Sequence, residues 1–284
     1  MATLRAYPNG LTVGMNSRGG NPNPPKRGEV VGWSTAAVRR HKTWLYSIDA
    51  PALDGCGWAV TLTLRDCPPD AATWQLVRNR WLERVRVMGA TRWHWVVEWQ
   101  RRGVPHIHAA VYVPQGDAKA GARLLRAWTE CAAVYGPGWT GQTAKRIDGP
   151  LGWLQYLSKH CARGVQHYQR QGKPEGWTKT GRLWGYGGQW PALEPIGATI
   201  TPQVAWRFRR LARSWRIADA RKALARAQTI PEIDAARRRI AYARRMLKCP
   251  DKSLSRFRGV SEWIPENVTS SACTRPGPRP PPRR

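Results

Sequence analysis

Acidic side chains are scarce in this 284-residue chain, with 18 Asp and Glu against 47 Lys and Arg and a formal net charge of +29. Such an excess of one sign repels itself and attracts polyanions, so nucleic acid is the expected partner. Phenylalanine is also scarce, with two residues, whereas tryptophan occurs 17 times. We expect most of the indoles in the core and a minority near the functional site, where they can stack on unpaired bases.

Paired cysteines and long apolar runs are missing as well. The six cysteines are scattered without a Cys-x-x-Cys pair, which argues against a zinc cluster or a disulfide framework and favours a reducing compartment. The N-terminus has no apolar run typical of a signal peptide, and no stretch approaches membrane-spanning length. We therefore expect a cytoplasmic protein without a membrane partner, long enough to bury a sizeable core.

The most informative local pattern lies in residues 91–108. Residues 92–99 are rich in Trp and Val and free of Gly and Pro, and residues 105–113 alternate with a period of two. Both patterns are typical of strands. The connection between them is short and basic and contains Arg101 and Arg102. The sequence therefore predicts a β-hairpin centred near Arg102.

This hairpin would bring one carboxylate and two imidazoles together. Glu98 would lie opposite His106, and His108, two residues further on, would share the same face. Two imidazoles and a carboxylate leave coordination positions open for water and substrate, as a catalytic metal site requires. A His-x-His pair alone is more often a pair of polar-face residues, and the carboxylate in register is what favours a site.

A second candidate for chemistry follows Asp148-Gly-Pro150, which predicts a helix running to about Arg163. A tyrosine hydroxyl is a poor nucleophile at neutral pH, and a cation one turn away favours its phenolate. Taken alone, Tyr-x-x-Lys is an ordinary pair on a helix surface. The spacing predicts two faces, with Leu154, Leu157 and Cys161 packed inward and Trp153, Tyr156, Lys159 and Arg163 on the opposite side.

Composition divides the chain into four parts. The first 30 residues are rich in Gly, Asn and Pro and the C-terminal tail is rich in Pro and Arg, so neither is expected to form a core. After Pro202, apolar stripes at helical spacing are embedded in arginine, which predicts a basic helical hairpin turning near Pro231. Its charge density favours phosphate contact over a merely solvated face. The expected parts are a disordered segment 1–30, a main domain 31–190, a basic helical region 191–248 and a disordered tail 249–284.

Three segments, in this order, resemble the HUH endonucleases, in particular the single-tyrosine rolling-circle replication initiators of bacterial plasmids and filamentous phages. Thr61-Leu-Thr-Leu64 is similar to the first motif, a core strand. Glu98 with His106-Ile-His108 is similar to the second, the metal site, and Tyr156-Leu-Ser-Lys159 to the third, the nucleophile with its lysine. The match spans residues 57–163, and the ordered combination is far more specific than any one motif.

The resemblance implies an α+β fold of ferredoxin-like kind for the main domain, with a central antiparallel sheet and flanking helices. It implies that Glu98, His106 and His108 hold Mg or Mn. It also implies transesterification, in which Tyr156 attacks a phosphodiester of unpaired origin DNA, frees a 3′-hydroxyl and forms a 5′-phosphotyrosyl link that can later be rejoined. Lys159 would position the ion or stabilise charge.

The partners implied are single-stranded and duplex origin DNA in a bacterial host cell. No Gly-x-x-x-x-Gly-Lys-Ser/Thr phosphate loop occurs, so a host helicase would have to unwind the duplex and a host polymerase would extend the 3′ end. Tyr168 is a weak second candidate for the nucleophile, and His94 is at most a neighbour of the ligands. The side chains expected to contact DNA are Arg101, Arg102, Arg163 and Arg182.

Three alternatives remain open. A HUH single-strand transposase or relaxase would use the same chemistry, although relaxases often have a third histidine in place of Glu98. A non-catalytic basic nucleic-acid-binding protein would carry the histidine pair incidentally, and its binding would be insensitive to a chelator. A non-haem iron oxygenase also uses two histidines and a carboxylate, but there the carboxylate usually follows or lies within the histidine pair, and a charge of +29 would serve no purpose.

Overall fold

The computed structural model describes residues 1–15, 28–114, 117–161, 163–165, 167–245 and 260–263, with the backbone alone for residues 15, 157–159 and 260–263. The chain divides into two compact units. The first, here called the central unit, comprises residues 25–192, and the second, the terminal unit, joins residues 1–24 to residues 193–284. Each unit has an antiparallel sheet of its own.

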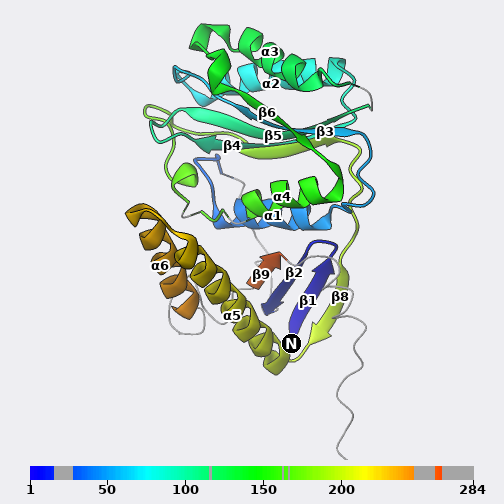
Figure 1. Ribbon diagram of the computed structural model, residues 1–284, viewed down its shortest axis with the longest axis vertical. Coiled ribbons are helices and arrows are strands. Elements are labelled where there is room, and N and C mark those ends of the chain that lie inside the picture. The colour runs from blue at the N-terminus through cyan, green and yellow to red at the C-terminus, as the bar shows by residue number, and fades with distance from the viewer. Residues whose placement is uncertain (16–27, 115–116, 162, 166, 246–259, 264–284) are drawn as a thin grey trace, which may run out of the picture. The chain divides into compact units, whose positions relative to one another are not determined.

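The central unit is a five-stranded antiparallel sheet with helices on both faces (Figure 1). Helices α2 and α3 cover one face, and α1 and α4 cover the other. The strand order β6-β3-β5-β4-β7 places the β4–β5 hairpin at the centre of the sheet. The predicted α+β class, with a central antiparallel sheet and flanking helices, is confirmed. The elements are α1 (Thr35–Ser47), β3 (Cys56–Leu62), α2 (Ala71–Val87), β4 (Arg92–Trp99), β5 (Pro105–Val113), α3 (Ala120–Cys131), β6 (Thr143–Ile147), α4 (Gly149–Cys161), the 3₁₀ turn η3 (Tyr168–Arg170) and β7 (Trp184–Gly188).

Local sequence signals account for the central hairpin. The amide of Gly103 donates to the carbonyl of Gln100 at 2.9 Å, and the amide of Gln100 donates to the carbonyl of Val104 at 2.9 Å, which closes the turn. Gly103 has a φ of 82°, a left-handed conformation that glycine adopts without a steric penalty. The resulting register pairs Glu98 with His106, as predicted.

Tryptophan fills much of the core between the sheet and the α2–α3 layer. Trp74, Trp81 and Trp128 are fully buried and meet edge to face, with ring centroids 6.0 and 6.3 Å apart. Two of the indoles satisfy their N–H groups on backbone carbonyls, Trp81 on Leu124 at 3.1 Å and Trp128 on Thr63 at 2.9 Å. Each buried indole removes about 200 Å² from water, worth about 5 kcal/mol at 25 cal/mol/Å².

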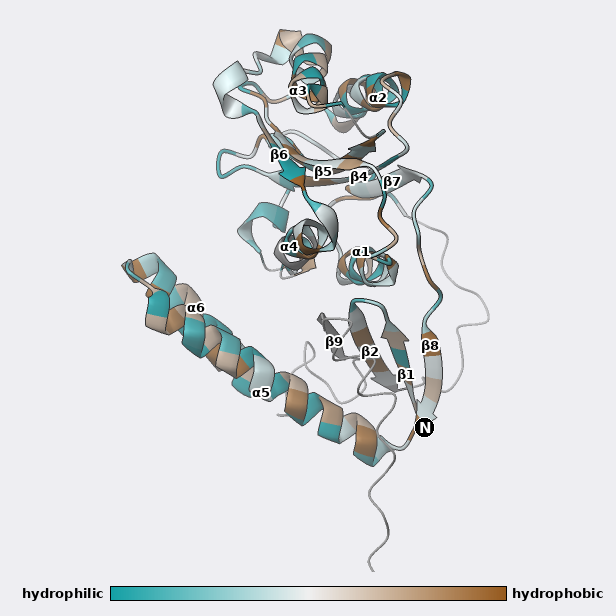
Figure 2. Ribbon diagram, turned by 45° about the vertical axis from the view of Figure 1, so that its right-hand side comes forward, coloured by the Kyte–Doolittle hydropathy of each residue, from teal (hydrophilic) through white to brown (hydrophobic). Residues whose placement is uncertain are grey.

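The terminal unit contains a four-stranded sheet and a helical hairpin. The strand order is β8-β1-β2-β9, with β1 (Ala2–Tyr7), β2 (Gly10–Met15), β8 (Ile196–Ile200) and β9 (Val260–Trp263). The predicted basic helical hairpin is confirmed as α5 (Pro202–Arg226) and α6 (Ile230–Arg245). Hydrophobic and hydrophilic residues interleave along both helices (Figure 2), and small buried side chains line their inner faces. These are Ala205, Ala212, Ala220, Ala236 and Ala243.

Two expectations of disorder are wrong in part. Residues 2–15 form the β1–β2 hairpin, which is stable because strands more than 180 residues away in the sequence pair with both of its edges. Residues 260–263 of the expected tail form one of those strands. Residues 16–27, 246–259 and 264–284 lie outside the described residues.

Among the described helices, none combines the length and the apolar composition needed to cross a bilayer.

Candidate functional site

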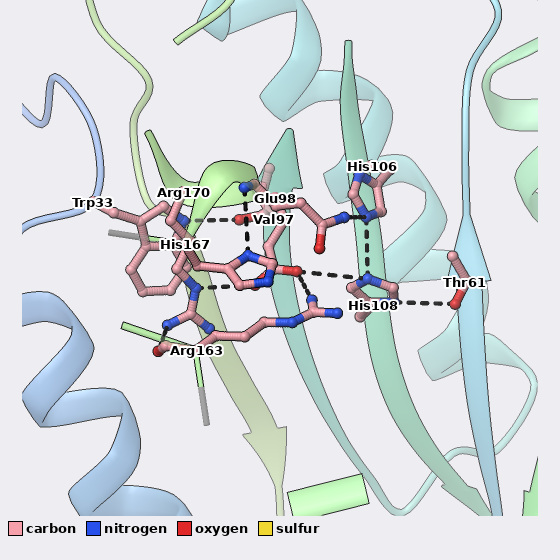
Figure 3. A network of polar contacts seen from close by, with 10 residues as sticks. Trp33, Thr61, Val97, Glu98, His106, His108, Arg163, His167 and Arg170 are labelled. Carbon is pink, nitrogen blue, oxygen red and sulfur yellow. Dashed lines mark hydrogen bonds and ion pairs between the residues drawn. The ribbon is translucent and has the colours of Figure 1, made fainter. Parts of the chain in front are cut away.

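The β4–β5 hairpin presents three side chains that could hold a metal ion, namely Glu98, His106 and His108 (Figure 3). One ligand atom from each lies within 4.8 Å of the others. The Nε2 atoms of the two imidazoles are 3.0 Å apart, and Nε2 of His108 lies 3.6 Å from a carboxylate oxygen of Glu98. The predicted convergence of these three side chains is therefore present.

The neighbouring strand β3 and the turn η3 each contribute a side chain that contacts one of the imidazoles. His108 lies beside Thr61 of β3 in the sheet register, and the Thr61 hydroxyl is 3.0 Å from Nδ1 of His108. A hydrogen bond at this nitrogen directs Nε2 toward the site, as partners of ligating histidines commonly do. From η3, the amide nitrogen of the Gln169 side chain lies 3.4 Å from Nε2 of His106.

Two arginines bind the carboxylate of Glu98, which is fully buried. Arg170 Nε donates to Oε1 at 2.9 Å, and Arg163 Nη1 pairs with Oε2. Arg170 also stacks on Trp33, with its guanidinium 4.3 Å from the ring centroid, and donates to the backbone carbonyl of Arg163 at 2.6 Å. Burial lowers the pKa of both guanidinium groups to about 10, so both remain cationic at neutral pH.

The donor set fits a divalent cation. Two imidazole nitrogens and one carboxylate oxygen, all on one rigid hairpin, leave further coordination positions for water or a phosphate oxygen.

Tyr156 lies on the same face of the sheet but is buried. Its hydroxyl is 3.0 Å from Nδ1 of His94, and burial raises its pKa well above the ordinary value of 10. His160, one turn further along α4, stands between this phenol and the ligands, with ring centroids 4.5 Å from Tyr156 and 5.5 Å from His108.

A pair of buried histidines lies behind Tyr156. His41 of α1 and His94 of β4 approach through their Nε2 atoms at 2.9 Å. Burial lowers the pKa of His94 to about 3, and burial together with the neighbouring His94 lowers the pKa of His41 well below its usual range. Both imidazoles are therefore neutral at pH 7. His94 contacts the tyrosine through its Nδ1.

The prediction for the faces of α4 was wrong for its aromatic residues. Trp153 and Tyr156 are buried together with Cys161, and their rings stack at 5.4 Å. They pack inward because the sheet beneath carries Tyr112 and His94, which offer ring contacts and a polar partner for the hydroxyl. Lys159 belongs to α4, and its side chain lies outside the described part of the chain.

The remaining predicted residues have different surroundings. Arg101 is exposed, with its guanidinium 5.6 Å from the ring of Tyr168, which is itself 54% exposed. Arg102 donates to the backbone carbonyls of Leu64 and Arg65, which fixes the hairpin turn. Arg182 lies just before β7 and is exposed.

Sequence reasoning missed Arg170, Gln169, His160 and His41 as parts of this region. Arg170 and Gln169 follow the helix in an irregular segment with no motif of their own. His41 comes from a helix more than 50 residues before the hairpin. Only His160 had a local signal, because it is the next turn of the helix that carries Tyr156.

A central antiparallel hairpin bearing two histidines and a glutamate, with a tyrosine helix packed on the same face, is the arrangement that the resemblance to the HUH replication initiators implies. Residues 57–164 match the family model for replication-associated proteins of the ORF2 type. The chain is 42% identical over 282 residues to a putative replication protein of Xylella fastidiosa strain 9a5c, covering 96% of this chain and 95% of the relative. It is also 38% identical over 273 residues to a replication-associated protein of Pseudomonas phage Pf3, covering 94% of each chain.

A second putative replication protein of Xylella fastidiosa, from strain Temecula1, is 40% identical over 272 residues, covering 93% of this chain and 99% of the relative. No solved structure gives a significant match. The chain therefore belongs to the ORF2-type family of replication-associated proteins and is a rolling-circle replication initiator.

Proposed function

We propose that this initiator nicks and rejoins single-stranded origin DNA through a metal-assisted 5′-phosphotyrosyl intermediate. The observation that carries the proposal is the buried triad of Glu98, His106 and His108, whose ligand atoms lie within 4.8 Å of one another. A buried carboxylate beside two imidazoles in a chain of net charge +29 suits phosphodiester chemistry. The non-haem oxygenase alternative offers no use for that charge.

The reaction exchanges one phosphodiester for another. The Tyr156 oxygen forms a bond to phosphorus as the bond to the 3′ oxygen breaks. The phenolic proton is lost and the departing oxygen takes one up, so the exchange needs no external energy and can run in reverse. A divalent cation at the triad would neutralise charge on the non-bridging oxygens and hold the phosphate in line.

Different residues would bind the cation, supply the nucleophile and stabilise the developing charge. Glu98, His106 and His108 would hold the cation, and Thr61 keeps the His108 ring oriented. Tyr156 would supply the nucleophile once its side chain leaves the contact with His94 and reaches the phosphate. Lys159 acts from the same helix on the charge that develops there.

Covalent capture tests the proposal. The protein is incubated with a single-stranded origin oligonucleotide and Mn²⁺, and the protein–DNA adduct is resolved on a denaturing gel. We expect an adduct that is lost with chelator and in Tyr156→Phe, and strongly reduced in His106→Ala. An adduct of unchanged yield in Tyr156→Phe removes this tyrosine from its role.

Tyr168 is the second candidate nucleophile, because it is exposed and lies close to the metal ligands. It is exposed, and its neighbours in η3, Gln169 and Arg170, contact His106 and Glu98 directly. Tyr168→Phe is therefore the matched control for Tyr156→Phe. Loss of the adduct in Tyr168→Phe, but not in Tyr156→Phe, would identify Tyr168 of η3 as the nucleophile.

DNA also has a second surface to bind, on the helical hairpin α5–α6. Arg237, Arg238, Arg239, Arg244 and Arg245 of α6 are all exposed, and none of them forms an ion pair within the described residues. We assign duplex origin DNA to these arginines and the unpaired strand to Arg101, Arg163 and Arg182. Strand separation and extension then fall to a host helicase and polymerase.

A further inference from the structure

Glu98 binds two guanidinium groups that are held in very different ways. Arg170 has a fully buried side chain fixed by three contacts, with Glu98 Oε1, with the backbone carbonyl of Arg163, and with the ring of Trp33. The Arg163 side chain is 15% exposed and pairs with Glu98 Oε2. That oxygen is also the one that lies 3.6 Å from Nε2 of His108.

The contacts of Glu98 Oε2 imply that Arg163 and a divalent cation compete for this oxygen. Oε2 is the carboxylate oxygen close to the His108 imidazole, so it is the one placed to bind a divalent cation together with the histidines, and Arg163 already pairs with it (Figure 3). A divalent cation added beside two guanidinium groups would place four positive charges around one buried carboxylate. Like charges at such distances repel strongly in a buried site. One guanidinium must therefore leave when the cation binds.

Geometry decides which one leaves. Arg170 cannot withdraw without breaking its stacking on Trp33 and leaving a buried charge without its anion. Arg163 can turn outward because its side chain reaches solvent, while its backbone stays tethered through its carbonyl to Arg170. Once released, its fork of donors matches the oxygens of a phosphate.

We propose that Arg163 and the divalent cation compete for Oε2 of Glu98, whereas Arg170 is a positioning residue that holds the same carboxylate ready for the cation. Arg163 exchanges its carboxylate for a phosphate of the DNA strand when the cation enters. The strand and the cation thus bind with positive coupling through a single side chain. This inference rests on the metal site of the proposed function.

The two arginines then have opposite effects on metal binding, which a titration can measure without any turnover. Mn²⁺ is titrated into the full-length protein and binding is followed by calorimetry and by the electron paramagnetic resonance signal of free Mn²⁺. We expect Arg163→Gln to tighten Mn²⁺ binding about tenfold and Arg170→Gln to weaken it about tenfold, the scale typical of groups that orient ligands. The matched control is Arg84→Gln, which breaks an exposed arginine–carboxylate pair with Glu130 and leaves the affinity unchanged.

Each outcome decides the question. Weaker or unchanged Mn²⁺ binding in Arg163→Gln overturns the competition, and unchanged binding in Arg170→Gln overturns the positioning role. If Arg170→Gln does not fold, as thermal unfolding would show, Arg170→Lys keeps the charge, loses the fork and is still expected to bind Mn²⁺ more weakly. Wild type that binds no Mn²⁺, with Arg163→Gln equally unable to bind, overturns the metal site itself and with it the proposed function.

The coupling has its own measurement in the Tyr156→Phe background, where no adduct forms. A labelled single-stranded oligonucleotide is titrated by fluorescence anisotropy with and without Mn²⁺. Mn²⁺ should tighten oligonucleotide binding about tenfold when Arg163 is present. The gain should be clearly smaller in Arg163→Gln, because the coupling between cation and DNA depends on this side chain leaving Glu98 for a phosphate. An equal gain in both proteins overturns the exchange of partners.

Discussion

The ligand hairpin β4–β5 and the helical hairpin α5–α6 differ in how their charged side chains are placed, buried and paired on the first and exposed on the second. On the ligand hairpin, Glu98 is fully buried and surrounded by paired cations and imidazoles. On α6, the exposed arginines form no ion pair among the described residues. The first arrangement fixes a few groups at defined distances, and the second leaves many groups free to follow a polyanion.

This difference sets the size and kind of effect expected from substitution. Removing one member of a buried charged cluster leaves the others desolvated without a partner, which is costly. Removing one exposed arginine from a basic surface changes affinity by a small amount that salt screens. Four substitutions test the comparison, from the largest expected effect to the smallest.

The strongest test removes the buried anion. Glu98→Gln leaves the guanidinium groups of Arg163 and Arg170 without a counter-charge, so we expect the free energy of unfolding to fall by about 3 kcal/mol. Urea denaturation followed by tryptophan fluorescence measures it. Glu130→Gln removes the anion of the exposed pair with Arg84 and should change stability by less than about 1 kcal/mol. Equal losses in the two variants would break the contrast between buried and exposed charge.

The second test uses pH. The folded protein keeps His94 neutral down to a pKa of about 3, whereas the unfolded chain protonates histidine near 6.5. The unfolded state therefore binds more protons below pH 6.5, and stability falls as the pH falls toward 3, by up to about 1.4 kcal/mol per pH unit for this group. His94→Gln should flatten the decline between pH 6.5 and 5 in denaturation curves. A slope identical to that of wild type would show that His94 is not buried in neutral form.

A smaller effect is expected from the strand beside the ligands. Thr61→Val keeps the shape of the side chain but removes the hydroxyl that lies 3.0 Å from Nδ1 of His108. We expect Mn²⁺ affinity to fall about tenfold, because the imidazole loses the partner that orients it. Thr63→Val is the control, since that hydroxyl donates to the carbonyl of Gly141. Matching affinities in the two variants would deny Thr61 any part in the site.

The smallest effect belongs to the exposed helix. Arg238→Gln on α6 should weaken duplex DNA binding by a similar factor for every sequence and reduce the slope of log K against log salt by about 0.9. Filter binding over a range of salt concentrations measures both. Arg80→Gln, on the exposed side of α2 in the central unit, should leave the slope unchanged. Sequence-dependent losses in Arg238→Gln would mean that this arginine reads bases and not phosphates.

The sequence was most informative where the determining contacts are short in range. The β4–β5 hairpin needs only strand periodicity and a turn that glycine can adopt, so the pairing of Glu98 with His106 followed from residues within 20 positions of one another. The α5–α6 hairpin likewise followed from helical spacing and Pro231. The terminal sheet was missed because β1 and β2 depend on strands β8 and β9, which lie at the other end of the chain.

The sequence by itself determined the ligand hairpin, the class of fold, the positive charge and the order of the motifs, because each follows from local residue spacing or from composition. Only the tertiary structure decided that Tyr156 is buried against His94 and that Arg163 and Arg170 share one carboxylate. The physical reason is the same in both cases. Burial and charge pairing depend on side chains brought together from separate elements, and local sequence patterns do not predict which of these side chains come into contact.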